Sequence, residues 1–202
     1  MTEKKNKIKK YTLFSFSLFT LFAIFGFLFN YSNPQEADLF FSSLEQEFSF
    51  IEDFNFFRTF LFLFVNNTIT VAIGAFLGVL FSILPLFILA VNGFVIGLVA
   101  GYVYPTFGLL GLILSLAPHG VFELTALFVG MGSGIYLGIS AINEVRNNNL
   151  GFGRLFKSIR RLNAPSEKIK EDYEYVFNLF LKLVIPLLFL AAVIEALLIL
   201  ML

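Results

Sequence analysis

Long apolar stretches are the feature of this sequence that most limits its possible folds. Five of them occur along the 202 residues, and each is long enough for a helix that crosses a bilayer, which needs roughly 20 mostly apolar residues. The chain is 58% hydrophobic and 14% charged, and a soluble domain of this length could not bury that much apolar surface. The stretches are residues 11–29, about 59–81, 83–104, 107–142 and about 176–202.

The sequence therefore predicts an all-α, polytopic transmembrane helical bundle that forms a single integral membrane domain over residues 1–202. The lysine-rich start, residues 1–10, resembles the beginning of a signal peptide. However, the apolar part at 11–29 is longer than usual and no small-x-small cleavage site follows it. We therefore expect residues 11–29 to be retained as the first span.

The uneven distribution of charge predicts the orientation in the lipid bilayer. Residues 1–10 carry five lysines, and residues 143–175 carry seven basic side chains. Residues 30–58 carry one arginine and six acids. Cytoplasmic segments are enriched in lysine and arginine. We therefore expect the N-terminus and 143–175 in the cytoplasm, and 30–58 and the C-terminus, after a span at 176–202, outside the cell membrane.

The fourth apolar stretch is too long for one crossing. At 1.5 Å per residue, residues 107–117 make about 16 Å of helix, whereas 119–142 make about 36 Å and can cross alone. We expect the chain to break at Pro118-His119-Gly120. Residues 107–117 are then a half-helix or re-entrant segment on the outer side, or an interfacial helix joined to the span by a tight turn. The prediction is five spans plus this half-helix.

The extracytoplasmic segment 30–58 has the pattern of an amphipathic helix that lies on the membrane or on the bundle. One face carries Phe40, Phe41, Leu44, Phe48 and Ile51. The other carries Asp38, Ser42, Glu45, Ser49 and Asp53. Such a helix either seals a bundle or presents a docking surface to an extracytoplasmic or membrane protein partner. The basic cytoplasmic segment suits the anionic inner leaflet, and we expect no nucleic-acid binding.

Glu123 is the only formally charged residue between Thr59 and Ile142, and it follows the only histidine, His119, by four residues. A carboxylate in so apolar a region is costly unless it faces water or polar partners. Residues four apart share a helix face, and a helix N-terminus favours a negative charge. Glu123 is therefore a candidate cation ligand or proton carrier.

Three asparagines, Asn66, Asn67 and Asn92, are the next candidates, because an amide in a bilayer must face another helix or water. They could join helices by hydrogen bonds, or they could form one polar site with His119 and Glu123. We favour the shared site. Glu195 would be its second carboxylate if it points inward, and otherwise it reaches the outer interface.

Cofactor chemistry has little support in the sequence. There is no cysteine and one histidine, whereas zinc sites use at least three protein ligands and metalloproteases use a two-histidine helix. We therefore expect no cofactor, no metal and no enzymatic activity. An intramembrane metal-dependent enzyme is the alternative.

Glycines recur at the four-residue spacing that lets helix backbones touch. We expect a tight core of the second, third and fourth spans, with part of a ridge left for a homo-oligomer. The residues with structural roles are Gly74, Gly78, Gly93, Gly97, Gly101, Pro118, Gly120, Gly130, Gly134 and Gly138.

Within residues 59–142, the polar-site core with spans two to four, three runs of residues resemble the stage II sporulation protein M family. They are Phe64-Val65-Asn66-Asn67, Leu84-Pro85 with Val91-Asn92-Gly93, and Pro118-His119-Gly120-Val121-Phe122-Glu123-Leu124. The resemblance covers about 60–142 and implies a multi-pass membrane protein. It also implies a second function. In sporulating bacteria the namesake acts as a scaffold that recruits cell-wall hydrolases during engulfment.

Two function hypotheses result. The first is passage of a proton, cation or small solute through the polar site, as a transporter or channel. The second is a non-catalytic scaffold that presents its outer helix or basic segment to partners.

Overall fold

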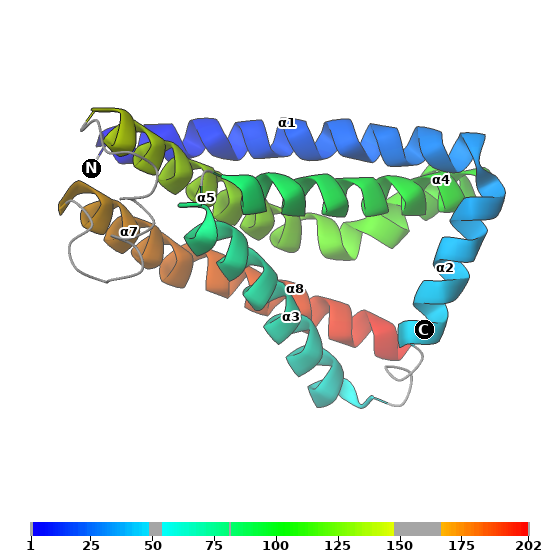
Figure 1. The fold of residues 1–202 in the computed structure, drawn as a ribbon. Helices are drawn as coiled ribbons and strands as arrows, with labels where there is room; N and C mark the ends of the chain where they lie inside the picture. Colours follow the sequence, from blue (N-terminus) through cyan, green and yellow to red (C-terminus); the bar gives the residue numbers. More distant parts are fainter. Residues whose placement is uncertain (1, 49–53, 81, 148–166, 202) are drawn as a thin grey trace.

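The computed structural model describes residues 2–48, 54–80, 82–147 and 167–201. The side chains of residues 45, 47, 48, 114–119, 145, 147, 200 and 201 lie outside this description. All regular structure in the described part is helical (Figure 1). The elements are α1 (Thr2–Ser32), α2 (Pro34–Phe48), α3 (Phe56–Leu77), α4 (Ile83–Gly120), α5 (Phe122–Asn147), α7 (Glu167–Leu179), the π-helical turn η2 (Phe180–Val184) and α8 (Ile185–Met201).

Five described helices are long and apolar enough to cross a membrane, which confirms the predicted bundle. They are Thr2–Ser32, Phe56–Leu77, Ile83–Ile113, Phe122–Glu144 and Glu167–Ile199. The first and last begin earlier than the predicted spans at 11–29 and 176–202, because the helices continue into their charged flanks. At 1.5 Å per residue, the 22 residues of α3 make about 33 Å of helix, close to the thickness of a bilayer core.

Spans that follow one another in the sequence alternate in direction, so the first and third spans are parallel. α1 and α4 run side by side in the same direction, with Gly97 against Ala23 and Gly101 against Asn30. α5 runs the opposite way along α1, since Gly132 touches Thr12. The two chain ends lie at opposite ends of the bundle (Figure 1). This agrees with an odd number of crossings, while the prediction that the N-terminal end is cytoplasmic stays a prediction.

The sharp reversal of the chain after the third span is at Gly108, and a second helix boundary, at Val121, directly follows the predicted break at Pro118-His119-Gly120. Gly108 has φ 66° and ψ −166° and interrupts α4, and this backbone conformation is essentially restricted to glycine. Residues 109–120 then form the expected half-helix, heading back toward the end where the N-terminus lies (Figure 1). The boundary with α5 is at Val121, whose backbone stays right-handed helical, so Pro118 lies inside the half-helix.

Glycines bring the backbones of α3 and α5 into direct contact. A Cβ added at Gly78 would meet the backbone of Gly134, and one added at Gly134 would meet the carbonyl of Gly74. Gly130 packs on Val71, and Gly138 lies against Gly78 and Ser82. These residues are called the α3–α5 seam below. The seam confirms the expectation that two glycine ridges bring helix backbones together.

The third ridge faces a different helix from the one we expected. Gly93, Gly97 and Gly101 of α4 pack on the backbone or side chains of α1, not on the second or fourth span. The amide of Asn30 also donates to the carbonyl of Leu98 at 3.3 Å across this contact. All three ridges are therefore occupied within one chain, and they give no support to a homo-oligomer.

Two further features of the fold are the proline inside the last span and the position of α2. The last span contains Pro186, which follows the π-helical turn η2. In this turn the N–H of Ile185 donates to the carbonyl of Phe180. A proline removes a helix hydrogen bond, and the extra residue in this turn lets the helix continue.

The helix α2 crosses the end of the bundle beside the C-terminus (Figure 1). The ring of its Phe41 lies 4.9 Å from that of Tyr102.

Candidate functional site

A polar pocket of about 150 Å³ lies among α1, α3, α4 and α5. Its walls are otherwise apolar, so the polar side chains stand out as a group. The lining residues are Phe19, Asn66, Asn67, Thr70, Val71, Asn92, Ile96, Glu123, Leu124 and Leu127. Four of the predicted site residues, Asn66, Asn67, Asn92 and Glu123, therefore meet at one cavity although up to 57 positions separate them in the sequence.

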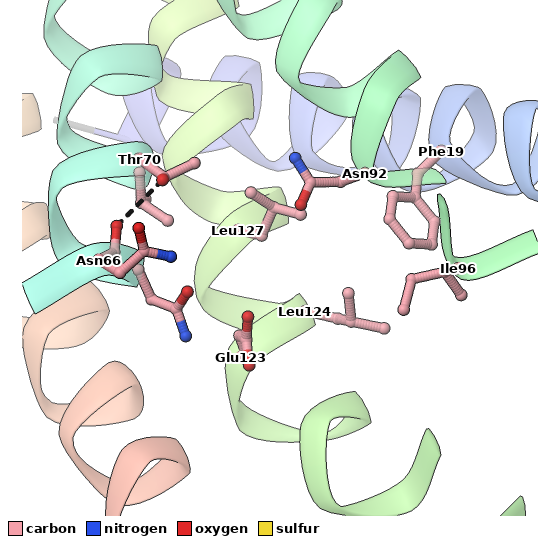
Figure 2. Close-up of a pocket in the computed structure, with 10 residues that line it drawn as sticks. Phe19, Asn66, Thr70, Asn92, Ile96, Glu123, Leu124 and Leu127 are labelled. Atoms are coloured by element: carbon pink, nitrogen blue, oxygen red, sulfur yellow. Dashed lines mark hydrogen bonds between the residues drawn. The ribbon is translucent and has the colours of Figure 1, made fainter. Parts of the chain in front are cut away.

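Three helices each contribute polar groups to the pocket (Figure 2). Asn66 and Asn67 lie at about the midpoint of α3, and Asn92 lies in the first half of α4. Glu123 is in the first turn of α5. Asn66 is exposed, whereas Asn67, Asn92 and Glu123 are half-buried, so the pocket lies between the helices and is not fully enclosed.

Local hydrogen bonds orient the polar side chains. The amide of Asn92 donates to the carbonyl of Ile88 at 2.8 Å, and its amide oxygen is turned the other way (Figure 2). The hydroxyl of Thr70 donates to the carbonyl of Asn66 at 3.0 Å. Because these two donors are used by the helix backbone, Asn92 and Thr70 offer oxygen acceptors to the pocket, while Asn66 and Asn67 each bring an amide with a donor and an acceptor.

Two predicted site residues are not placed at the pocket. The side chain of His119 lies outside the described part, and its backbone ends the half-helix just before α5. Glu195 of α8 is buried but does not line the pocket, which corrects its assignment to the site. The reason is that α8 packs along the flank of α3, with Phe189 against the rings of Phe60 and Phe64.

The apolar core closes the pocket toward the end of the bundle that holds the N-terminus. Val71 and Leu127 form part of its wall and also belong to this core. Beyond them Ala75, Leu89 and Met131 are fully buried, and the α3–α5 seam continues in the same direction. The pocket is therefore blocked on that side in this conformation.

The chemistry of the pocket suits a proton, a small cation or a hydrogen-bonding solute. A carboxylate, three amides and a hydroxyl provide the oxygen ligands that hard cations prefer. Among the described residues, no three His, Cys, Asp or Glu side chains come together to hold a metal ion. The site thus offers one ionisable group and several neutral oxygens.

A second buried polar cluster escaped the sequence reasoning. Asp172 of α7 is 1% exposed. It accepts hydrogen bonds from the hydroxyls of Tyr136 and Ser140, both at 2.6 Å. Lys4 of α1 completes the cluster with an ion pair to Asp172 at 2.8 Å. One signal was present in the sequence, because Asp172 falls between Ile169 and Val176 on the apolar stripe of α7, where a charged residue requires a partner.

A family model described as Stage II sporulation protein M matches residues 15–198. The match extends beyond residues 60–142, which carry the resemblance in the sequence, to nearly the whole chain. No curated protein and no solved structure matches this chain.

Proposed function

This chain belongs to the stage II sporulation protein M family, and on that premise we propose that it is a multi-pass membrane protein that binds a small cation, a proton or a hydrogen-bonding solute in the pocket at Glu123 and passes it across the bilayer. One observation carries the proposal. Asn66, Asn67, Asn92 and Glu123, from three helices, border one cavity. Ionisable groups kept inside a membrane bundle are by default functional.

The route would be one-sided in any single conformation. The apolar core and the α3–α5 seam separate the pocket from the end that holds the N-terminus. Passage therefore requires α5 to move against α3, as in transporters whose broken helices frame a site near the bilayer midplane. The break at Gly108 and the boundary at Val121 provide two places where the segment before α5 could bend.

Flux through reconstituted protein tests this proposal. Proteoliposomes with the wild-type chain should take up protons or alkali cations faster than empty vesicles, and Glu123→Gln should reduce the rate to that of empty vesicles. The matched control is Glu36→Gln, which removes an exposed acid on α2 and should leave the rate unchanged. Equal rates for wild type, Glu123→Gln and empty vesicles would rule out transport of these ions.

A scaffold is the second candidate, and the placement of α2 favours it. This helix lies across the end of the bundle (Figure 1), and Leu39 on it is 63% exposed. The scaffold proposal predicts a co-purifying membrane or extracytoplasmic partner that Leu39→Glu releases and Ser42→Glu, on the polar face of the same helix, retains. Purification from native membranes without any such partner would contradict it.

Orientation and assembly complete the proposal. We place the N-terminus in the cytoplasm and the C-terminus outside, on the strength of the lysines in residues 1–10 and the basic residues of 143–175. The chain performs no catalytic step and binds no cofactor in this proposal. Self-association into a homo-oligomer would use surfaces other than the three glycine ridges. Topology reporters fused to each end test the orientation.

A further inference from the structure

A second cavity lies at the end of the bundle that holds the N-terminus, away from the pocket at Glu123. This basic groove has a volume of about 610 Å³ and is formed by α1 with one ring from α5. Its floor is apolar and its rim is polar. The floor is Leu13, Phe16 and Phe128, and the rim is Asn6, Lys9, Lys10 and Thr12.

The floor of the basic groove is firmly built. The rings of Phe16 and Phe128 meet edge-to-face with their centroids 5.5 Å apart, which is a favourable geometry for an aromatic pair. Gly132 lets α5 approach the backbone of Thr12, so the two helices are closest just beside the groove. Leu13 and Phe16 are nonetheless more than half exposed, so the floor is left uncovered by the chain itself.

The two lysines at the rim are not paired with an acid in the described part of the chain. Lys4 pairs with Asp172 and Glu171, and Lys7 pairs with Glu3 at 2.7 Å. Within the described part of the chain, neither Lys9 nor Lys10 takes part in an ion pair. Of the lysines near this end of α1, the two on the groove rim are therefore available to an external anion.

The spacing of charge and apolar surface matches one molecule of lipid. From Lys10 to Phe16 the helix rises about 9 Å at 1.5 Å per residue. An anionic headgroup held by Lys9 and Lys10 would therefore have its acyl chains beginning at the level of Leu13 and Phe16. A soluble anion would satisfy the lysines but would leave the apolar floor uncovered.

We propose that the basic groove binds an anionic phospholipid, with its phosphate held by Lys9 and Lys10 and an acyl chain lying over Leu13, Phe16 and Phe128. Basic sites between transmembrane helices bind anionic lipid headgroups by this combination of charge and apolar contact. The groove is distinct from the pocket at Glu123 and does not depend on what that pocket carries.

Native mass spectrometry of the full chain, released from detergent micelles, tests the proposal with defined lipids. The wild type should retain one dioleoylphosphatidylglycerol in preference to dioleoylphosphatidylcholine. The double variant Lys9→Gln/Lys10→Gln should weaken retention of the phosphatidylglycerol by about thirtyfold, because each of the two lysines contributes to the binding free energy of the anionic headgroup. The matched control Lys5→Gln/Lys168→Gln removes two exposed lysines outside the groove and should retain the lipid as the wild type does.

Two further measurements distinguish lipid binding from binding of a soluble anion and from nonspecific attraction to positive charge. Phe16→Ala should also weaken lipid retention, and excess glycerol 1-phosphate should not displace the lipid. An equal loss of phosphatidylglycerol retention in the two double variants would overturn the proposal. Equal retention of the two lipids by the wild type would also overturn it. Displacement by glycerol 1-phosphate would overturn it as well, because it would show that only the headgroup charge is recognised.

Discussion

Two carboxylates in the apolar bundle have opposite surroundings: Asp172 is buried, whereas Glu123 is half-buried. Asp172 is packed tightly by two hydroxyls and a lysine, all within 2.8 Å of its oxygens. Glu123 borders a cavity of about 150 Å³ together with three amides. The comparison teaches that the surroundings, rather than the residue type, separate a structural acid from a candidate functional one. Both oxygens of the Asp172 carboxylate face partners in this cluster, whereas Glu123 borders a cavity.

The Asp172 cluster also joins parts of the chain that are far apart in sequence. Lys4 is on α1, Tyr136 and Ser140 are on α5, and Asp172 is on α7. Breaking a buried charge pair by removing one partner is costly, even where the intact pair adds little net stability. We therefore expect the cluster to govern stability and the pocket to govern function.

Removal of the Asp172 side chain should have the largest effect on stability. Asp172→Ala leaves two buried hydroxyls and a lysine without their acceptor, and it should lower the free energy of unfolding by about 3 to 5 kcal/mol. Denaturant unfolding of the detergent-solubilised protein measures the loss. Glu174→Ala, at an exposed position of the same helix, should change it by less than about 0.5 kcal/mol. Equal effects of the two variants would contradict a structural role for the cluster.

The α3–α5 seam lies between the two carboxylates. A substitution in it should lower the free energy of unfolding less than Asp172→Ala does, but by a measurable amount. Gly134→Ala places a methyl group on the carbonyl of Gly74, and this overpacking should cost about 1 to 3 kcal/mol of unfolding free energy. Gly120→Ala is the matched control, because nothing lies within 4 Å of its added Cβ. If both variants unfold at the same denaturant concentration, the helices are not in backbone contact at the seam.

Glu123→Gln should have the smallest effect on stability, under about 1 kcal/mol, because the amide keeps the size of the side chain beside a cavity that can accommodate it. The same denaturant titration measures this, with Asp172→Asn as the equivalent change in the packed cluster. We expect the Asp172 variant to be clearly the less stable of the two. A larger loss for Glu123→Gln would mean that Glu123 is a structural acid after all.

Much of the fold followed from composition, because helices that satisfy their own backbone groups are among the few structures that can cross a bilayer. The grouping of Asn66, Asn92 and Glu123 around one cavity was predicted from the cost of placing polar side chains separately against lipid. The close contact at the α3–α5 seam, which includes Gly74 and Gly134, was predicted from the four-residue spacing of the glycines. These features depend on short-range patterns, or on the cost of placing a polar side chain against lipid.

The features that sequence reasoning missed depend on long-range pairing. Asp172 was read as part of a solvated basic segment, because its partner Lys4 is 168 positions away in the sequence. A break was predicted only at Pro118-His119-Gly120, and the reversal at Gly108, which supplies a positive φ, was not singled out. The Gly93 ridge was assigned to the wrong neighbour because spacing predicts that a helix packs closely but does not identify its partner.

Thiol accessibility tests the central claim, that the cavity at Glu123 takes up polar species from water, most directly. The chain has no cysteine, so a single one can be introduced without background. Asn92→Cys should react with a membrane-impermeant cationic methanethiosulfonate in intact vesicles, and Leu89→Cys, one turn away in the fully buried core, should not. Equal lack of reaction at both positions would contradict the account, because the cavity would then be closed to the species it is proposed to bind.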